Sequence, residues 1–250
     1  MTKALIDGDV LMYLAIWGCE SQAEAEDKFE SIFTDVTESV FAKDIAMAFG
    51  GPTNFRKDIY PDYKRSASRV KTKSNRPDFF YSFKDSLCER EDSMMCVGYE
   101  ADDQVRIWAR ECEKENIHTV VISVDKDLDC IPGVHFNPKT RKSYCISKSE
   151  ANFHYWRQII MGDPVDNIPG VEGIGKVYSQ RILSDAKDRG VKLKHAACYE
   201  YHKKYGEEGY ERLLFNGKLI HILRDPNDHF FVRRESYDKA IRTLEDIEGV

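Results

Sequence analysis

The chain has 250 residues, of which 42% are hydrophobic and 32% charged, so it can bury a substantial core as a soluble globular protein. Its seven cysteines form no CxxC pair, and no histidine lies near a cysteine at zinc-like spacing, which argues against structural zinc and for reduced thiols in a cytoplasm. No apolar run is long enough to span a membrane, so we expect no membrane partner. The net charge of −6 taken alone argues against a nucleic-acid partner.

The N-terminus predicts a strand, an acidic turn and a helix. Residues 3–6 form a short, mostly apolar run, Asp7-Gly8-Asp9 follows, and residues 10–17 are apolar again. Asp7 would end the strand as a metal ligand, or it would cap the following helix; the pattern alone does not decide between the two. Residues 23–41 then have the apolar spacing of an amphipathic helix, and residues 45–49 predict a second strand.

A basic segment follows the second strand. Eight basic and two acidic side chains between Arg56 and Arg76 give this segment a charge of +6 and leave −12 on the rest of the chain. Such a segment suits a polyanionic partner, although a solvated basic loop would give the same count. Tyr63 and Lys64 place a ring beside a cation, as in proteins that bind single strands. We expect residues 66–75 to be flexible and residues 79–91 to be helical.

Two acidic clusters come where apolar runs stop. Residues 94–97 predict a strand before Glu100, Asp102 and Asp103, which open a helix over residues 101–113. Residues 120–124 predict a buried parallel strand that ends at Asp125 and Asp127. Carboxylates gathered at strand ends repel one another unless cations neutralise them, and oxygen-only ligands favour Mg²⁺ or Mn²⁺. Either cluster alone is as readily explained as a solvated acidic loop.

The C-terminal part carries a glycine-rich turn. After short strands at 133–136 and 143–146, Ser149 is expected to cap a helix. Asp163 and Asp166 then precede Gly170, Gly173, Gly175 and Lys176. Glycines and free amides at a helix start let a phosphate backbone approach closely, which is typical of a helix-hairpin-helix element that grips a duplex. An ordinary glycine turn is the alternative.

Five ordered motifs in residues 3–185 resemble those of the 5′-nuclease superfamily, which includes flap endonucleases, phage 5′→3′ exonucleases and the 5′-nuclease domain of bacterial DNA polymerase I. The motifs are Ile6-Asp7-Gly8-Asp9, Asn54-Phe55-Arg56 with Pro61-Asp62-Tyr63-Lys64, Glu100-Ala101-Asp102-Asp103, Ser123-Val124-Asp125-Lys126-Asp127, and Met161-Gly162-Asp163 through Gly175. The compact length is most similar to a phage-type enzyme that stands alone.

The resemblance implies an α/β fold with a PIN-like, mostly parallel central sheet, a helical arch and a duplex-binding region of the helix-hairpin-helix type (H2TH). We expect a nuclease core at residues 1–160, with the arch at about 56–91, and a helical DNA-binding region at 161–250 packed on it as one unit. The implied activity is metal-dependent 5′→3′ exonuclease or 5′-flap endonuclease cleavage of DNA, with RNA primers as a further substrate, in the cytoplasm of a bacterium or a phage-infected cell.

The resemblance also implies the residues of the site. Two Mg²⁺ or Mn²⁺ ions are expected, and some relatives bind K⁺ at the glycine turn. The implied metal ligands are Asp7, Glu100, Asp102, Asp103, Asp125, Asp127, Asp163 and Asp166, with Asp103 in an outer position and the last three serving the second ion. The implied catalytic residues are Lys64, Asp125 and Asp127. The implied nucleic-acid contacts are Arg56, Tyr63, Lys64, Arg65, Arg69, Lys71, Gly170, Gly173, Gly175 and Lys176.

Two departures from the superfamily pattern stand out. Relatives often place an aspartate in the loop after the second strand, where this chain has Gly50 and Gly51. The arch motif Tyr-Lys-x-x-Arg lacks its arginine, so Arg65 or Arg69 would replace it.

Two other functions compete with the nuclease. A haloacid-dehalogenase-like phosphatase would use Asp7 as nucleophile and Asp9 as acid, but a small substrate needs neither the basic segment nor the glycine turn. A non-catalytic protein that binds structured DNA would keep the fold without the metal chemistry, and the eight candidate ligands argue against it.

Overall fold

The structure, a computed structural model, describes residues 2–249 and divides into two compact units. The first unit comprises Met1–Phe55, Thr72–Glu150 and Ile222–Asp228, and the second comprises Arg56–Lys71, Ala151–His221 and His229–Val250. The division expected near residue 160 therefore differs from the one observed, because the start of the basic segment groups with the C-terminal helices.

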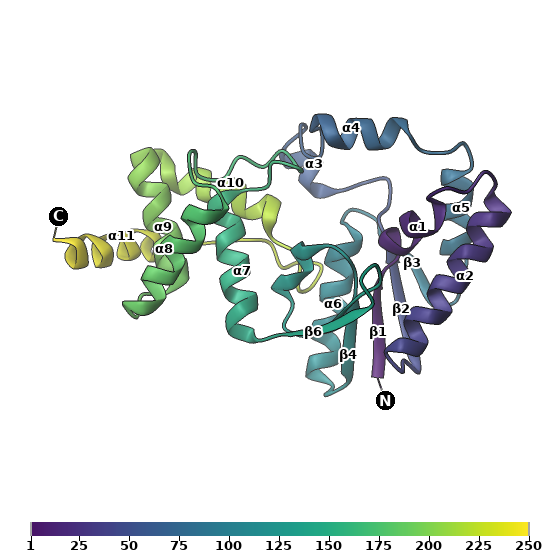
Figure 1. Cartoon of the computed structure of the whole chain (residues 1–250). Helices are drawn as coiled ribbons and strands as arrows, with labels where there is room; N and C mark the ends of the chain where they lie inside the picture. Colours follow the sequence, from purple (N-terminus) through teal and green to yellow (C-terminus); the bar gives the residue numbers. More distant parts are fainter. Residues whose placement is uncertain (1, 250) are drawn as a thin grey trace. The chain divides into compact units, whose positions relative to one another are not determined.

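The first unit is built on one mixed sheet (Figure 1). Its strands are β1 (Thr2–Asp7), β2 (Asp44–Phe49), β3 (Ser93–Met95), β4 (His118–Ile122), β5 (Gly133–Asn137) and β6 (Lys142–Ile146). They lie in the order β3-β2-β1-β4-β5-β6, and every neighbouring pair is parallel except β5 and β6. The predicted α/β fold with a mostly parallel sheet is confirmed.

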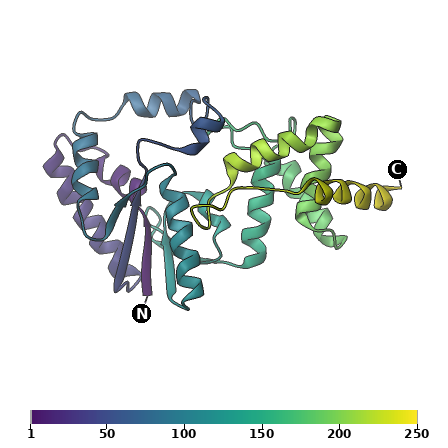
Figure 2. The ribbon, with the colours of Figure 1, turned by 180° about the vertical axis from the view of Figure 1, so that it is seen from behind.

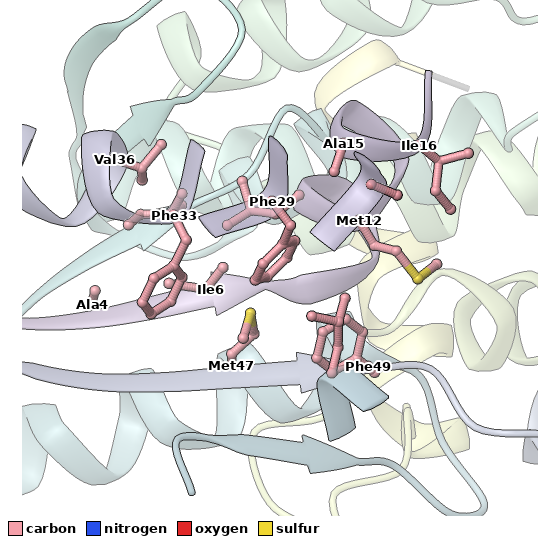
Figure 3. Close-up of a cluster of buried hydrophobic side chains, with 14 of the residues drawn as sticks. Ala4, Ile6, Met12, Ala15, Ile16, Phe29, Phe33, Val36, Met47 and Phe49 are labelled. Atoms are coloured by element: carbon pink, nitrogen blue, oxygen red, sulfur yellow. The ribbon is translucent and has the colours of Figure 1, made fainter. Parts of the chain in front are cut away.

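Helices cover both faces of this sheet. They are α1 (Gly8–Ile16), α2 (Gln22–Ser39), α5 (Phe80–Cys88) and α6 (Ala101–Lys114), with a short 3₁₀ helix η1 (Lys126–Cys130) after β4. Alternate residues of the central strands, such as Ile6 and Met47, pack with Phe29 and Phe33 of α2 in one core (Figure 3). Helix α6 packs on β1, β2 and β4 (Figure 2). Strands β1 and β4 pair in parallel, with Thr2 opposite His118, so their carboxyl ends lie side by side.

The middle of the basic segment is helical, whereas the sequence predicts no regular element at residues 66–75. The flexibility expected there stays a prediction. Helix α4 (Ala67–Ser74) begins after Ser66, whose Oγ accepts a hydrogen bond from the Arg69 amide at 3.4 Å, as an N-cap does. The boundary between the two units falls within this helix. Sequence reasoning missed it because its apolar stripe is almost absent.

The second unit is helical. Its elements are α3 (Phe55–Ile59), α7 (Lys148–Met161), α8 (Lys176–Asp188), α9 (Leu193–Tyr205), η2 (Gly206–Glu208), α10 (Gly209–Ile220) and α11 (Arg234–Glu248), with the first residues of α3 and α7 belonging to the first unit. Ile159, Leu183, Tyr201 and Leu213 are fully buried in its core. Helix α7 starts earlier than expected, because Ser147 and not Ser149 accepts the Glu150 amide as its cap, at 3.2 Å.

Among the residues that the structure describes, no helix combines the length and the apolarity needed to cross a membrane.

Phe29 tests the core of the first unit. Its ring is fully buried and lies 5.9 Å from that of Phe33 and 6.1 Å from that of Phe83. We expect Phe29→Ala to lower the free energy of unfolding by ~3–5 kcal/mol, because it removes buried apolar surface and leaves a cavity. Urea denaturation measures the loss. The matched control is Phe41→Ala, since Phe41 is 84% exposed; losses of equal size in both variants would contradict this packing.

Candidate metal centre and nucleic-acid interface

Two neighbouring parallel strands bring carboxylates to one edge of the sheet. Asp7 is the last residue of β1, and Asp125 follows the end of β4 by three residues. Asp7 is only 4% exposed, and Ser123 beside it is buried as well. This is the edge at which open α/β sheets bind their ligands.

A chain of hydrogen bonds fixes these groups. The Ser123 hydroxyl donates to Asp7 Oδ2 at 2.9 Å and accepts from the Asp125 amide at 2.9 Å. Asp125 Oδ1 in turn accepts from the Asp127 amide at 2.9 Å, which starts η1. Sequence reasoning did not single out Ser123, although a lone polar residue inside a β-branched strand end was a usable signal. Asp7 Oδ1 also accepts from the Val10 amide at 3.3 Å, so the helix-capping role left open by the sequence is present too.

The position of Asp7, buried beside other carboxylates, changes its pKa. Burial, followed by the negative charges of Asp9 and Asp125, raises the pKa of Asp7 from 3.8 to about 7, against the hydrogen bonds from Ser123 and Val10. Near neutral pH the cluster therefore holds a proton that a cation could replace.

The second acidic cluster opens α6. Asp103 is fully buried, and its two carboxylate oxygens accept from the Glu100 amide at 2.9 Å and the Leu223 amide at 2.8 Å. Glu100 and Asp102 are only half-buried. Because both Asp103 oxygens already serve backbone amides, the geometry fits the outer position expected for Asp103 and leaves direct ligation to Glu100 and Asp102 as a prediction.

The donor set of the first unit fits a hard divalent cation. Asp7, Glu100, Asp102, Asp125 and Asp127 all offer carboxylate oxygens, and Mg²⁺ and Mn²⁺ prefer such ligands. The raised pKa of Asp7 points the same way, because burial and the charges of Asp9 and Asp125 disfavour its ionised form, and a bound cation would offset both.

The second unit holds the remaining two predicted ligands. Asp163 Oδ1 accepts from the Val165 amide at 2.8 Å, and burial together with the charge of Asp166 raises the pKa of Asp163. Asp166 is 5% exposed. Their assignment to a second ion stays a prediction.

Two cations of the basic segment converge on Asp166. Arg69 donates to Asp166 Oδ1 from Nε at 3.0 Å and from Nη2 at 2.7 Å, and Lys64 Nζ lies 3.6 Å from Oδ2. Arg65 instead pairs with Asp62 at 3.5 Å, where both side chains are exposed. Of the two arginines considered for the missing arch residue, Arg69 is therefore the one placed beside Lys64, and Lys71 lies exposed on the same helix, α4.

Two predicted nucleic-acid contacts have a different environment. Arg56 is 2% exposed, and its guanidinium donates to the carbonyl oxygens of Leu219 at 2.9 Å and His221 at 2.6 Å. Tyr63 is 4% exposed and packs against Ile168 and Leu219. Both side chains hold the start of the basic segment onto α10. Their direct contact with nucleic acid stays a prediction.

The glycine turn separates into two parts. Gly170 has φ +63° and lies so close to Gly162 that a Cβ would meet the Gly162 nitrogen at 2.3 Å, so it serves packing inside the turn. Gly173, at φ +85°, and Gly175, the N-cap of α8, have open space around them. With exposed Lys176 they are the residues that a phosphate backbone could approach.

The sequence matches a family model over residues 2–144, described as the 5′-3′ exonuclease, N-terminal resolvase-like domain. The chain belongs to the 5′-3′ exonuclease family. Relatives include the DNA polymerase I of Rhizobium leguminosarum, 28% identical over 185 residues, and that of Chloroflexus aurantiacus, 24% identical over 254 residues. These matches cover 68% and 88% of this chain but only 17% and 26% of the relatives, so the chain corresponds to a minor part of each polymerase.

The fold of this 5′-3′ exonuclease family member is also found in phage enzymes. The flap endonuclease of bacteriophage T5, in a pseudo-enzyme-product complex with DNA and metal ions, matches with a TM-score of 0.69 and 21% identity over 100% of both chains. The likeness shows a shared fold along the whole chain. The predicted 5′-nuclease superfamily is confirmed.

The pKa of Asp7 yields a pH-dependent prediction. A folded-state pKa of about 7 lies above the ordinary 3.8, so this group destabilises the metal-free protein progressively as pH rises from about 4 to about 7. A divalent cation that binds deprotonated Asp7 offsets this loss. We expect the rise in melting temperature on adding Mg²⁺ to be larger at pH 8 than at pH 6, measured by differential scanning fluorimetry. An equal rise at both pH values, or the same difference in Asp7→Asn, would contradict the assignment.

Proposed function

We propose that this protein is a metal-dependent 5′→3′ exonuclease and structure-specific 5′-flap endonuclease that hydrolyses phosphodiester bonds of DNA. The observation that carries the proposal is the hydrogen-bonded array of buried Asp7, buried Ser123 and half-buried Asp125 at the carboxyl ends of two parallel strands. Family membership supplies the reaction class, and the array supplies a place for it.

The carboxylates bind and orient the cations. Two Mg²⁺ ions, when bound, would supply an activated water and charge stabilisation at the scissile phosphate. Asp7 and Asp125, with Glu100 and Asp102, would hold the first ion, and Asp127 would serve the second. The hydrogen bonds from Ser123 and from backbone amides keep Asp7 and Asp125 in fixed orientations, so little reorganisation is needed when substrate arrives.

Asp163 and Asp166 complete the proposed ligands of the second ion. Lys64 and Arg69 pair with Asp166 in the DNA-free protein, which supports a role for these two cations beside the proposed ligands of the second ion. The same cations would turn to the phosphate of a bound strand, which offers the same kind of anionic oxygen.

Basic and glycine-lined surfaces would grip the substrate. Lys71 on α4 and Arg65 are exposed and suit contacts with phosphates. Gly173, Gly175 and Lys176 would hold the duplex backbone without reading its sequence, and K⁺ could join them there.

The finer points of the proposal follow the family resemblance. We favour Mg²⁺ over Mn²⁺ as the physiological ion, and DNA 5′ ends and 5′ flaps as the main substrates, with RNA primers on DNA as a second class. The cytoplasm of a bacterium or of a phage-infected host, during DNA replication or degradation, is the proposed setting.

The phosphatase alternative loses support from the environment of Asp9. Its oxygens are engaged by the Gly50 amide at 2.8 Å and by Lys84 Nζ at 2.6 Å, so Asp9 already serves to tie α1 to the loop after β2 and to α5. The other alternative, a non-catalytic DNA-binding protein, is distinguished from the nuclease by whether the protein cleaves DNA.

Asp125→Asn tests the proposal. We expect the native protein to cleave a 5′-flap duplex near the junction in Mg²⁺, to lose all cleavage with chelator, and to lose at least ~100-fold in rate with the substitution, the scale of one strong transition-state contact. Labels at each strand end in turn report the position and polarity of cleavage. Tight binding of the flap without cleavage at any Mg²⁺ or Mn²⁺ concentration would favour the binding protein, and cleavage of a small phosphomonoester but not of DNA would favour the phosphatase.

The two arginines make a matched pair for a second test. Arg69→Gln should lower kcat/KM on the flap by roughly 10–100-fold, the scale of one charge-assisted hydrogen bond, whereas Arg65→Gln should change it only a few-fold. Single-turnover kinetics on both variants measure the difference. A larger loss for Arg65→Gln would assign the missing arch arginine to Arg65 instead.

A further inference from the structure

The turn that carries Lys64 has a strained backbone. Lys64 has φ +57°, in the left-handed region that lysine rarely adopts. The Arg65 amide donates to the Asp62 carbonyl oxygen at 3.1 Å, which closes the turn around Tyr63 and Lys64. A residue in such a conformation persists only where its surroundings hold it, and strained residues gather at functional sites. The groups that hold this turn are therefore candidates for residues that act on Lys64.

A loop from the same unit lies against the turn. Asp163 and Ile168 pair through their backbones, with N···O distances of 2.9 and 2.7 Å, and so close a loop of four residues between them. The Asp166 carbonyl oxygen, in this loop, accepts from the Lys64 amide at 2.9 Å. Both segments belong to the second unit. The backbone of Lys64 is therefore bonded directly to this loop.

The side chain of Asn167, in the same loop, bonds to the turn. Its Nδ2 donates to the Asp62 carbonyl oxygen at 3.0 Å and to the Tyr60 hydroxyl oxygen at 3.2 Å. The amide nitrogen of asparagine carries two hydrogens, one for each of these acceptors. The Asp62 carbonyl oxygen thus accepts from Asn167 as well as from the Arg65 amide. Asn167 therefore bonds to the same oxygen that closes the turn around Lys64.

Aromatic packing holds the turn from its other side. Tyr63 is buried against Ile168 and Leu219, and the Tyr60 ring lies edge-on to that of Phe215, with 5.4 Å between the centroids. These contacts dock the turn onto α10, whereas the hydrogen bonds hold its backbone conformation.

The docked turn also directs the lysine side chain. Lys64 Nζ lies 3.6 Å from Asp166 Oδ2, so the ammonium group points back at the loop that holds the turn. Backbone conformation and side-chain direction of Lys64 are therefore set by the same two segments.

We propose that Asn167 is a positioning residue for Lys64: its side-chain amide holds the turn at residues 62–65 closed, so that the Lys64 ammonium group is in place when a phosphate arrives. This inference rests on the proposed function, because it takes Lys64 as a cation that acts on the scissile phosphate. The competing structural explanation starts from the φ of Asn167 itself, +62°, which asparagine tolerates better than most residues. On that explanation Asn167 only allows its own loop to form.

Asn167→Gly separates these two roles. Glycine adopts positive φ freely, so the loop keeps its backbone while the Nδ2 donor is lost. We expect the single-turnover rate of flap cleavage to fall about 10–100-fold, because displacing a catalytic group by ~1 Å can cost ~100-fold. The protein concentration that half-saturates the rate should stay within about threefold of the native value. Circular dichroism and thermal melting report whether the variant is folded.

A double variant tests whether Asn167 acts through Lys64. We expect Lys64→Ala to lower the rate by about 100-fold, the scale of one strong transition-state contact. Adding Asn167→Gly to Lys64→Ala should then change the rate less than about twofold, because Lys64 is no longer there to be positioned. Losses from independent residues would multiply instead.

Two further variants complete the design. Asn116→Gly is the matched control, because Asn116 is also left-handed, with φ +57°, but is exposed between α6 and β4; its rate should stay within about twofold of the native value. If Asn167→Gly does not fold, Asn167→Asp takes its place. Aspartate also tolerates positive φ, and its carboxylate cannot donate to the Asp62 carbonyl oxygen.

The outcomes are distinguishable. If the native protein cleaves the flap and folded Asn167→Gly cleaves it within threefold of the native rate, Asn167 only forms its loop and the inference is overturned. Multiplying losses in the double variant, or a native rate in Lys64→Ala, would also overturn it and leave the proposed function standing. If the native protein cleaves no flap in Mg²⁺ or Mn²⁺, the proposed function has failed, and the inference with it.

Discussion

Mutual repulsion among carboxylates gathered at one edge of the sheet is the constraint on which the first unit depends. Asp7 and Asp125 are carried to the same edge because β1 and β4 run parallel and side by side, and Asp9 adds a third negative charge. The consequence of this placement is that the pKa of Asp7 is raised to about 7. A divalent cation resolves the repulsion, so the same placement that weakens the metal-free protein prepares it for metal-dependent chemistry.

In each unit, basic side chains pair with some of the acidic residues and so reduce the repulsion among the carboxylates. Lys84 partly neutralises Asp9 in the first unit, and Lys64 and Arg69 neutralise Asp166 in the second. Asp166 is almost completely buried, so its partners cannot be exchanged for water at little cost.

Much of the first unit could be predicted from the sequence, because most of its strands are short apolar or β-branched runs and two of them, β1 and β4, lead into aspartates. The acidic clusters could be recognised for the same reason. The sequence did not predict which polar residues tertiary packing would bury. Arg56 and Tyr63 lie in a basic, aromatic segment typical of nucleic-acid contacts, yet both pack onto α10, a helix more than 140 residues later in the chain. Ser123 was quoted only as part of a motif, because its partner Asp7 lies on a neighbouring strand and the pairing of these strands is set by tertiary structure. The helix at residues 67–74 has too few apolar side chains for its period to be visible.

Proton release on metal binding tests the central claim most directly. Titrating the DNA-free protein with Mg²⁺ at pH 6.5 in buffers of different ionisation enthalpy gives the number of protons released per ion by calorimetry. If Asp7 is a ligand with a raised pKa, binding releases a proton near this pH, the release vanishes by about pH 9, and Asp7→Asn abolishes it. Tight Mg²⁺ binding without proton release at pH 6.5, or an unchanged release in Asp7→Asn, would contradict the claim that this carboxylate array is the metal centre.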